Sequence, residues 1–243
     1  MACSERIIRS LRHELRNLLF WAAAFRFTVR RLGLHRISQP LWNFNDVPIL
    51  VINLPRRYDR LNQIRAELSR MSIREFELVQ GVDGKIEFPE SPVLAGKRGC
   101  AASHLKALSR AGLLNCPVLV LEDDVIFTQP PEELQRIVDV FLADSSLDLL
   151  LLDWSTVRAK SISSQLSLVT DSVLCSAYLV KPLAINSIIR SFERSAQELQ
   201  RGRDFPIDHA WWRPQRWELV TVAPKIKLCV QSPGQSDIKV ASV

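Results

Sequence analysis

The stretch CPVLVLEDDVIF, Cys116 to Phe127, decides the fold of this chain. Its branched apolar residues follow one another without interruption, which is typical of a strand buried on both faces of a sheet. The strand ends in three consecutive carboxylates, Glu122, Asp123 and Asp124. Adjacent carboxylates repel one another, and burying even one without a partner costs free energy. We therefore expect the triplet to be either solvated or neutralised by a cation.

The segments on either side of this stretch alternate between strand and helix patterns. We predict strands over residues 47–54, 74–84, 117–124, 147–155 and 172–180, and helices over 56–71, 99–115, 130–144 and 182–202. A looser, serine-rich segment covers residues 161–167, and a mixed tail follows the last helix. This order predicts an α/β fold with an open, mostly parallel sheet and helices on both faces. A chain of 243 residues with 47% hydrophobic content can bury the core of such a domain.

The net charge of +6 belongs to one end of the chain. Residues 1–40 hold eight Arg and two Glu, so their balance is 8 − 2 = +6, whereas the remainder has 24 basic and 24 acidic residues. The basicity therefore gives no indication of a nucleic-acid partner for the main domain, and we expect none. We predict a basic arm over residues 1–40 and one main domain over residues 41–243.

The basic arm has the pattern of an amphipathic helix. Its longest uncharged stretch, Asn17 to Phe25, is nine residues, which is too short to cross a bilayer. Leu11, Leu15 and Leu18 fall near helical spacing with Arg between them, as in a helix that lies on an anionic membrane surface. A helix that packs on the main domain and solvates its Arg face would give the same pattern.

The cysteines indicate a reducing compartment. The chain has five, an odd number, and none form a CxxC pair. Together with the arm, this predicts a cytoplasmic protein held peripherally on the inner face of the membrane.

The acidic triplet has the composition of a site for a hard cation. In open α/β sheets, ligands bind beyond the carboxyl ends of the strands, where Glu122, Asp123 and Asp124 stand. Carboxylates without a neighbouring Cys or His in sequence favour Mg²⁺ or Mn²⁺ over zinc. The alternative is an ordinary strand exit with solvated acids. Three acids in a row after a buried strand favour the metal site.

Four stretches in register resemble glycosyltransferase family 25, which includes bacterial lipooligosaccharide galactosyltransferases and collagen galactosyltransferases. They are VINLPRRYDRL at 51–61, GKRGCAASHLKAL at 96–108, VLVLEDDVIF at 118–127 and SAYLVKPLA at 176–184, within a resemblance that covers about residues 47–240. It implies a GT-A-like fold, in which a nucleotide sugar lies across the carboxyl ends of the strands. It also implies that an acidic motif, here Glu122, Asp123 and Asp124, holds a divalent metal, Mn or Mg, against the diphosphate.

The resemblance also implies a site for the UDP-sugar donor. Ser103 and His104 share a helix face with Cys100 near the helix N-terminus, where free amides favour an anion. A lone helical His is more often a packing residue, and we interpret Cys100 as a small buried apolar residue. The residues that we assign to the donor site are Asn53, Arg60, Ser103, His104, Ser236 and Asp237.

Inverting glycosyl transfer needs a base that deprotonates the acceptor hydroxyl. The candidates are Asp208 and His209 in FPIDHAWW and Asp153 at the end of LLLLD. The resemblance places an acidic residue in a P-x-D context at Asp208. Trp211 and Trp212 could stack on a sugar ring or could be ordinary core aromatics.

These observations predict an enzyme, a metal-dependent inverting hexosyltransferase. It would move galactose or glucose from a UDP-sugar to a hydroxyl of a cell-surface glycan such as lipopolysaccharide. The alternative is a catalytically weak, membrane-associated relative that binds a glycan or a protein. A glycosidase with paired carboxylates lacks support, because the metal and the diphosphate already account for the acids. Lys97 and Arg98 stand where many relatives have an acidic residue, so the donor sugar stays open.

Overall fold

The computed structural model describes residues 2–32, 42–156 and 158–233 of the chain. This part of the chain forms ten strands: β1 Ile49–Asn53, β2 Glu77–Gln80, β3 Val118–Glu122, β4 Val125–Phe127, β5 Leu149–Leu151, β6 Arg158–Ser161, β7 Leu166–Thr170, β8 Ala177–Val180, β9 Thr221–Pro224 and β10 Cys229–Gln231. The α-helices are α1 Ala2–Arg31, α2 Tyr58–Arg70, α3 Gly84–Glu87, α4 Ala95–Leu114, α5 Pro131–Ala143, α6 Pro182–Gln200, α7 Ile207–Ala210 and α8 Trp212–Trp217, and a 3-10 turn covers Phe44–Asp46.

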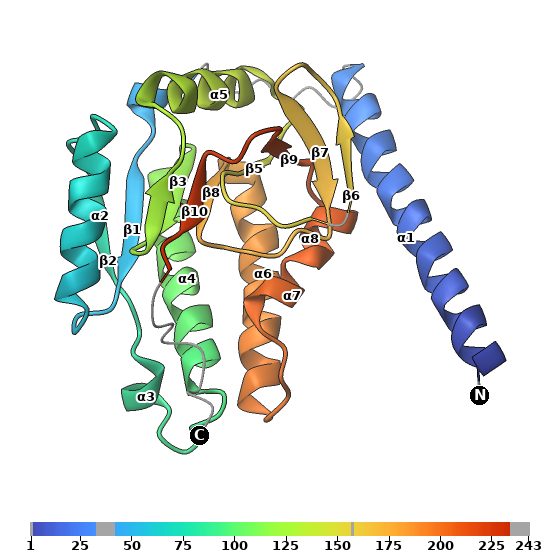
Figure 1. Cartoon of the computed structure of the whole chain (residues 1–243), viewed down its shortest axis with the longest axis horizontal. Coiled ribbons are helices and arrows are strands. Elements are labelled where there is room, and N and C mark those ends of the chain that lie inside the picture. Colours follow the sequence, from blue (N-terminus) through green and yellow to red (C-terminus); the bar gives the residue numbers. More distant parts are fainter. Residues whose placement is uncertain (1, 33–41, 157, 234–243) are drawn as a thin grey trace.

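The centre of the molecule is an eight-stranded sheet in the order β2-β1-β3-β8-β5-β9-β7-β6 (Figure 1). The pairs β1–β2, β1–β3 and β5–β9 are parallel. The pairs that involve β8 or β7 are antiparallel, so these two strands run against the other six. The prediction of an α/β fold with an open sheet that runs mostly in one direction is confirmed.

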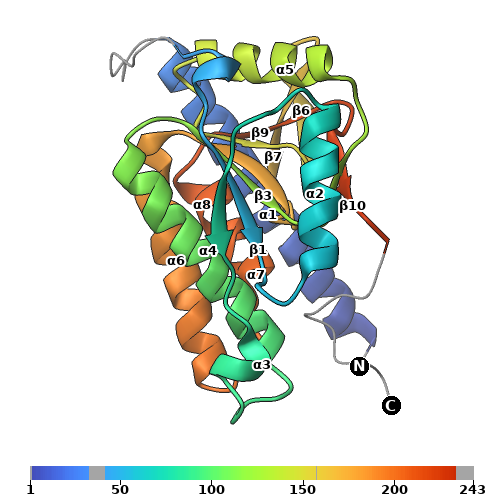
Figure 2. The ribbon, with the colours of Figure 1, turned by 90° about the vertical axis from the view of Figure 1, so that its left-hand side faces the viewer.

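Each face of the sheet is covered by helices, because successive side chains of a strand point to opposite faces. On β3, Leu119 and Leu121 join the core under α2 and α5. Val118 and Val120 join the second core, under α4 and α6. Figure 2 shows α4 and α6 on one side of the sheet and α2 on the other. The predicted run of buried residues before the acidic triplet therefore follows from burial on both faces.

The helix α4 begins four residues earlier than the spacing predicted. Close backbone contacts at two glycines fix its position against α3. A Cβ on Gly84 would lie 1.7 Å from the carbonyl oxygen of Ala95, and one on Gly99 would lie 2.6 Å from the amide nitrogen of Gly84. The backbones of α3 and α4 thus pack at a distance that only glycine allows. This contact holds the first turn of α4 beside the loop that follows β2.

The serine-rich segment and the tail form strands that the sequence pattern did not indicate. Residues 158–170 make the β6–β7 hairpin at the edge of the sheet, and β9 pairs with β7. The short strand β10 pairs with β4, directly after the acidic triplet, with Gln231 opposite Val125. This pairing returns the end of the described chain to the carboxyl end of β3.

The helix α1 packs on the rest of the chain along one face. Leu19, Ala23 and Phe27 are buried. Arg26 donates a hydrogen bond of 2.6 Å to the carbonyl oxygen of Arg216 in α8, and Arg30 forms an ion pair with Asp148. None of the described helices is long and apolar enough to cross a membrane. The predicted boundary at residue 40 lies outside the described residues.

Candidate functional site at the carboxyl end of β3

The acidic triplet lies at the carboxyl ends of the parallel strands β1 and β3, where Ile52 is opposite Glu122. A cavity opens there, between the loops that follow β1 and β2, the first turns of α4 and the end of β10. Its lining includes the three acids together with Arg56, Arg60, Gly84, Lys85, Gly96, Cys100, Ser103, His104 and Gln231. The sheet therefore brings predicted metal ligands and predicted donor residues to one cavity.

Asp123 is held by two of the predicted donor residues. It is 6% exposed, and it accepts hydrogen bonds from Nδ2 of Asn53 at 2.7 Å and from Arg60 at 3.1 Å. Burial raises the pKa of Asp123, although the bonds from Asn53 and Arg60 oppose this effect. Asn53 also donates to the carbonyl oxygen of Arg57 at 3.1 Å, which fixes the loop after β1. Asn53 and Arg60 thus position a carboxylate at the cavity wall.

Asp124 carries an unsatisfied oxygen. Arg60 donates to its Oδ2 at 3.1 Å, whereas its Oδ1 is buried and has no hydrogen-bond partner among the described residues. Burial, and then repulsion from Glu122, raises the pKa of Asp124 to about 7. A buried carboxylate oxygen without a donor is costly, and a cation would supply the missing partner.

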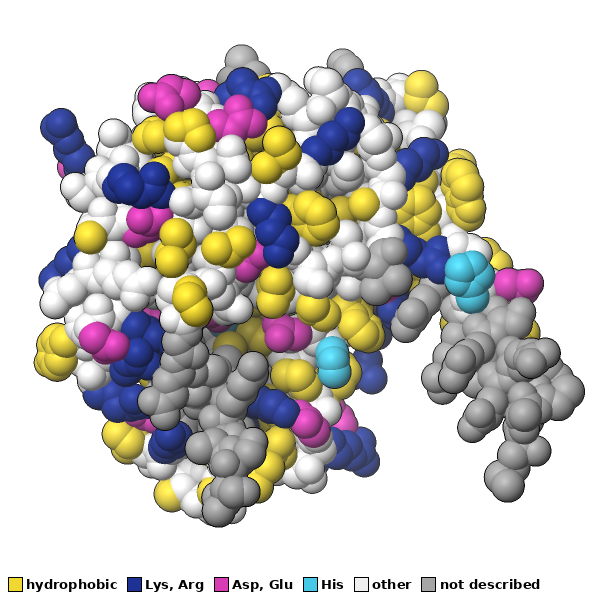
Figure 3. Space-filling view, in the orientation of Figure 1, with side chains coloured by type: hydrophobic (Ala, Val, Ile, Leu, Met, Phe, Trp, Pro, Cys, Tyr) yellow, Lys and Arg dark blue, Asp and Glu magenta, His cyan; other side chains and the backbone are white. Residues whose placement is uncertain are grey.

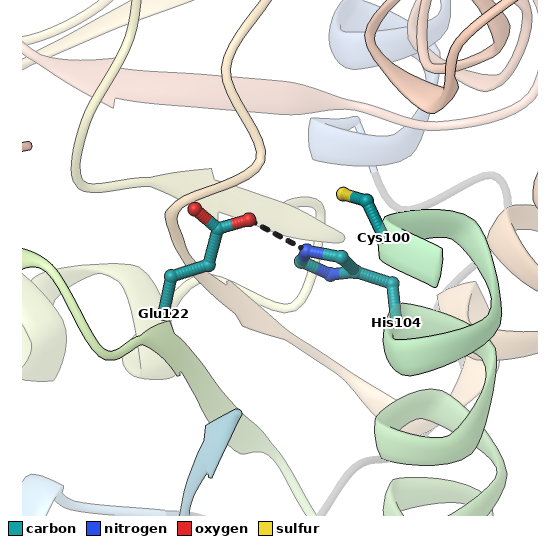
Figure 4. A group of neighbouring side chains, drawn as sticks. All are labelled: Cys100, His104 and Glu122. Carbon is teal, nitrogen blue, oxygen red and sulfur yellow. Dashed lines mark hydrogen bonds and ion pairs between the residues drawn. The ribbon is translucent and has the colours of Figure 1, made fainter. Parts of the chain in front are cut away.

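Glu122 is held by a buried relay from α4 (Figure 4). It accepts from Nε2 of His104 at 3.0 Å and from Nε2 of Gln231 at 3.1 Å, and Nδ1 of His104 lies 3.2 Å from the hydroxyl of Tyr178. Burial is the largest influence and opposes the charge on Glu122, but the hydrogen bonds from His104 and Gln231 and the charge of Arg60 act together against it, and the pKa of Glu122 is lowered. Burial raises the pKa of Tyr178, so its hydroxyl keeps its proton and donates to Nδ1. We assign the proton of neutral His104 to Nε2 on this pattern.

Cys100, His104 and Glu122 place one ligand atom each within 4.8 Å of one another. They do not fit a zinc ion in this arrangement, because both ring nitrogens of His104 already have partners. Burial raises the pKa of the Cys100 thiol, which disfavours the thiolate that zinc requires. Cys100 is partly buried and packs against the core under α4, which is close to the prediction of a small buried apolar residue.

Ser103 connects the loop after β2 to α4. Its hydroxyl donates to the carbonyl oxygen of Gly99 at 2.7 Å and accepts from the amide of Val82 at 2.8 Å. Ser103 therefore shapes the cavity wall at which its donor role was predicted.

The three candidate bases are not among the described residues that line the cavity. Asp208, at the start of α7, accepts a hydrogen bond from the Cys175 thiol, and burial raises its pKa, as does the charge of Glu122. Asp153 is 2% exposed and accepts from Ser176 at 2.9 Å and from Lys227 at 3.1 Å. His209 is exposed, and its ring lies 5.1 Å from that of Trp212.

Other predicted residues lie apart from the cavity or outside the described residues. Trp211 is fully buried and packs on Tyr178 and Phe192 with ring centroids 5.1 and 5.2 Å apart, so it is a core aromatic. Ser236 and Asp237 fall outside the described part of the chain. Sequence reasoning assigned no role to Gln231 or Tyr178, although Tyr178 lies in the stretch at 176–184 that carries the resemblance to family 25.

The cavity combines acidic and basic parts. Three carboxylates against one guanidinium give −3 + 1 = −2 at the triplet, if all three acids are ionised. The lining also includes Lys85 and Arg56, which pairs with Asp83. Hard oxygen ligands with a net charge of −2 fit a divalent cation, and a basic rim fits an anion that shares the cation.

Comparisons with known proteins give a partial match. No protein-family profile matches the sequence. A protein of Acanthamoeba polyphaga mimivirus that is named as a glycosyltransferase is 32% identical over 96 residues, which cover 34% of this chain and 30% of that protein. The match therefore spans less than a third of the relative's length.

Two solved structures share a coarse likeness. One is a glycosyltransferase involved in the glycosylation of the major capsid of PBCV-1, with 10% identity, a TM-score of 0.37 and coverage of 74% of this chain and 92% of that chain. The other is a nucleoside-diphosphate-sugar pyrophosphorylase from Vibrio cholerae RC9, with 16% identity, a TM-score of 0.34 and coverage of 74% and 76%. Scores this low support no argument about fold or function.

Proposed function

We propose that this chain is a metal-dependent inverting glycosyltransferase with a GT-A-like fold. It moves a hexose, galactose or glucose, from a UDP-sugar to a hydroxyl of a cell-surface glycan such as lipopolysaccharide. The observation that carries the proposal is the buried Oδ1 of Asp124, which has no hydrogen-bond partner among the described residues, in a cavity lined by three carboxylates of which two pair with Arg60. The partial similarity to a protein named as a glycosyltransferase supports glycosyl transfer. The family, the donor and the acceptor rest on the four stretches that resemble family 25.

The acids of the triplet would hold the metal, Mn²⁺ or Mg²⁺. Asp123 and Asp124 present oxygens to the cavity, and the His104–Tyr178 relay fixes the carboxylate of Glu122 beside them. A bound divalent metal supplies Lewis-acid stabilisation of the departing UDP. Arg56 and Lys85, which also line the cavity, would bind and orient the diphosphate oxygens.

Asp208 is the preferred base among the three candidates. Its raised pKa suits a group that accepts a proton from the acceptor hydroxyl, and burial and then the charge of Glu122 raise this pKa. Asp153 is less suited, because its carboxylate already pairs with Lys227 and accepts a hydrogen bond from Ser176. His209 is exposed and stays the second candidate.

We also propose that α1 attaches the enzyme to the inner face of an anionic membrane from the cytoplasm. The helix exposes large apolar side chains, and these are Leu11, Leu15, Leu18, Trp21 and Phe25. Figure 3 shows hydrophobic side chains along the right-hand edge of the molecule, over α1. Lys160 of β6 lies 4.8 Å from the Trp21 ring and adds a positive charge beside this face. An apolar face with cations at its margin fits an anionic lipid surface.

A binding protein with weak catalysis is the second candidate, and one observation favours it. Arg60 already pairs with two of the three acids, which lowers the need for a metal. The release of UDP from UDP-galactose and UDP-glucose, measured with lipopolysaccharide as acceptor, distinguishes the two functions. We expect release in Mn²⁺ that EDTA abolishes. Binding of either donor without release above the uncatalysed rate would support the second candidate.

A further inference from the structure

Arg60 lies between the two aspartates of the triplet. One nitrogen of its guanidinium group is 3.1 Å from Asp123 and 3.1 Å from Asp124. The three side chains are 14%, 8% and 12% exposed, so water screens the pair poorly. The guanidinium therefore provides a positive charge where the proposed metal would bind.

Arg60 neutralises the triplet only in part. It brings one positive charge against three carboxylates, and Oδ1 of Asp124 still has no partner among the described residues. A divalent cation brings twice the charge in a smaller volume and can bind oxygens of both aspartates. A cation bound there would lie within contact distance of the guanidinium, and two positive charges at that separation repel one another.

The guanidinium group of Arg60 could bind the donor diphosphate in place of the two aspartates. The residue lines the same cavity as Arg56 and Lys85, which would bind the donor diphosphate. A guanidinium group also binds phosphate oxygens, and it can do so through two parallel hydrogen bonds, whereas Arg60 contacts both aspartates through one nitrogen. Movement within the cavity would exchange one set of anionic oxygens for the other.

We propose that Arg60 is an internal cation that holds the triplet in the metal-free protein, and that a divalent metal displaces it toward the diphosphate of the donor. The inference rests on the proposed function, because it needs a metal and a diphosphate at this cavity. It has a thermodynamic consequence. Metal alone binds weakly, since it must displace Arg60, whereas metal and UDP bind cooperatively, since the diphosphate receives the displaced guanidinium.

The test is a titration of Mn²⁺, followed by electron paramagnetic resonance, into the full chain and into Arg60→Gln. A neighbouring opposite charge changes the proton affinity of a carboxylate by about one to three powers of ten, so we expect Arg60→Gln to bind Mn²⁺ about tenfold more tightly without nucleotide. The same variant should bind UDP more weakly than the wild type in saturating Mn²⁺, because the diphosphate loses a ligand. Opposite changes in the two affinities are the signature of displacement.

Two further variants control the test. Arg65→Gln removes the same charge from an exposed position of α2 and should leave both affinities within about twofold. Arg60→Lys keeps the charge and should keep weak binding of Mn²⁺, which also guards against a folding defect in Arg60→Gln. Equal affinity of wild type and Arg60→Gln for Mn²⁺, or weaker binding by the variant, would overturn the inference alone. Absence of Mn²⁺ binding by every protein would overturn the metal assignment itself.

Discussion

At the scale of single residues, Asp124 is the group whose environment most requires a ligand. Its side chain is largely buried, one oxygen pairs with Arg60, and the other has no partner among the described residues. Burial and repulsion from Glu122 raise its pKa from 3.8 to about 7. The metal-free protein therefore stores an unfavourable charge at this position near neutral pH.

This charge predicts how Asp124→Asn changes stability with pH. Between about pH 4 and pH 7 the folded protein keeps a proton on Asp124 that the unfolded chain has lost, so the contribution of Asp124 to stability falls as pH rises. The Asn variant has no such loss. Its melting temperature in EDTA, relative to the wild type, should therefore rise from pH 4 to pH 8, and it should not transfer sugar. A difference in melting temperature that is constant with pH would contradict the shifted pKa.

The base is tested by Asp208→Asn. If Asp208 accepts the proton of the acceptor hydroxyl, turnover should fall about a hundredfold or more while the affinities for UDP and Mn²⁺ stay unchanged. His209→Ala and Asp153→Asn are the matched comparisons and should each cost less. A reversed order between Asp208→Asn and either comparison would transfer the role to that residue, and weaker UDP binding by Asp208→Asn would place Asp208 in the donor site.

At the scale of elements, α1 separates into two faces with different roles. Phe27 and Arg30 face the rest of the chain, and Arg30 pairs with Asp148, which is 6% exposed. The same helix exposes Leu15 to 58% and Phe25 to 70%. Packing therefore accounts for one face of the helix, and membrane binding stays a proposal for the other. Deletion of the arm would remove both, and it would leave the buried Asp148 without Arg30.

Substitutions on the exposed face of α1 test membrane binding without this complication. Leu15→Glu together with Phe25→Glu should reduce binding to vesicles that contain anionic lipid while the melting temperature changes little, because neither side chain is buried. Leu113→Glu, at an 80% exposed position of α4, is the control and should bind vesicles as the wild type does. Equal vesicle binding by all three proteins would remove the membrane role from α1.

The elements that the sequence predicted are those with a strong internal pattern. Branched apolar runs predicted β1, β3, β5 and β8, and apolar spacing with proline at the start predicted α5 and α6. The β6–β7 hairpin was missed because β6 lies at the sheet edge and carries Arg158 and Lys160 where an alternating pattern needs apolar residues. The strand β10 has three residues, and its existence depends on pairing with β4.

At the scale of the whole molecule, the sequence predicted several residues of the site but not the hydrogen bonds and ion pairs between them. The strand-end acids were visible in the sequence, and so were Asn53, Arg60 and His104. The bond from Asn53 to Asp123 joins positions 70 residues apart, and the bond from Gln231 to Glu122 joins positions 109 apart. Such contacts follow from strand order and register, which local patterns do not contain. The same limit applies to Arg60, whose bridge between Asp123 and Asp124 required the folded chain.

The central claim is that the carboxyl end of β3 holds a divalent cation that the nucleotide donor needs. The most direct measurement is a calorimetric titration of UDP into the full chain, once in Mn²⁺ and once in EDTA, repeated with Asp124→Asn. We predict binding by the wild type in Mn²⁺, at least about tenfold weaker binding in EDTA, and weak binding by the variant under both conditions. Equal affinity of the wild type for UDP in Mn²⁺ and in EDTA would contradict the account.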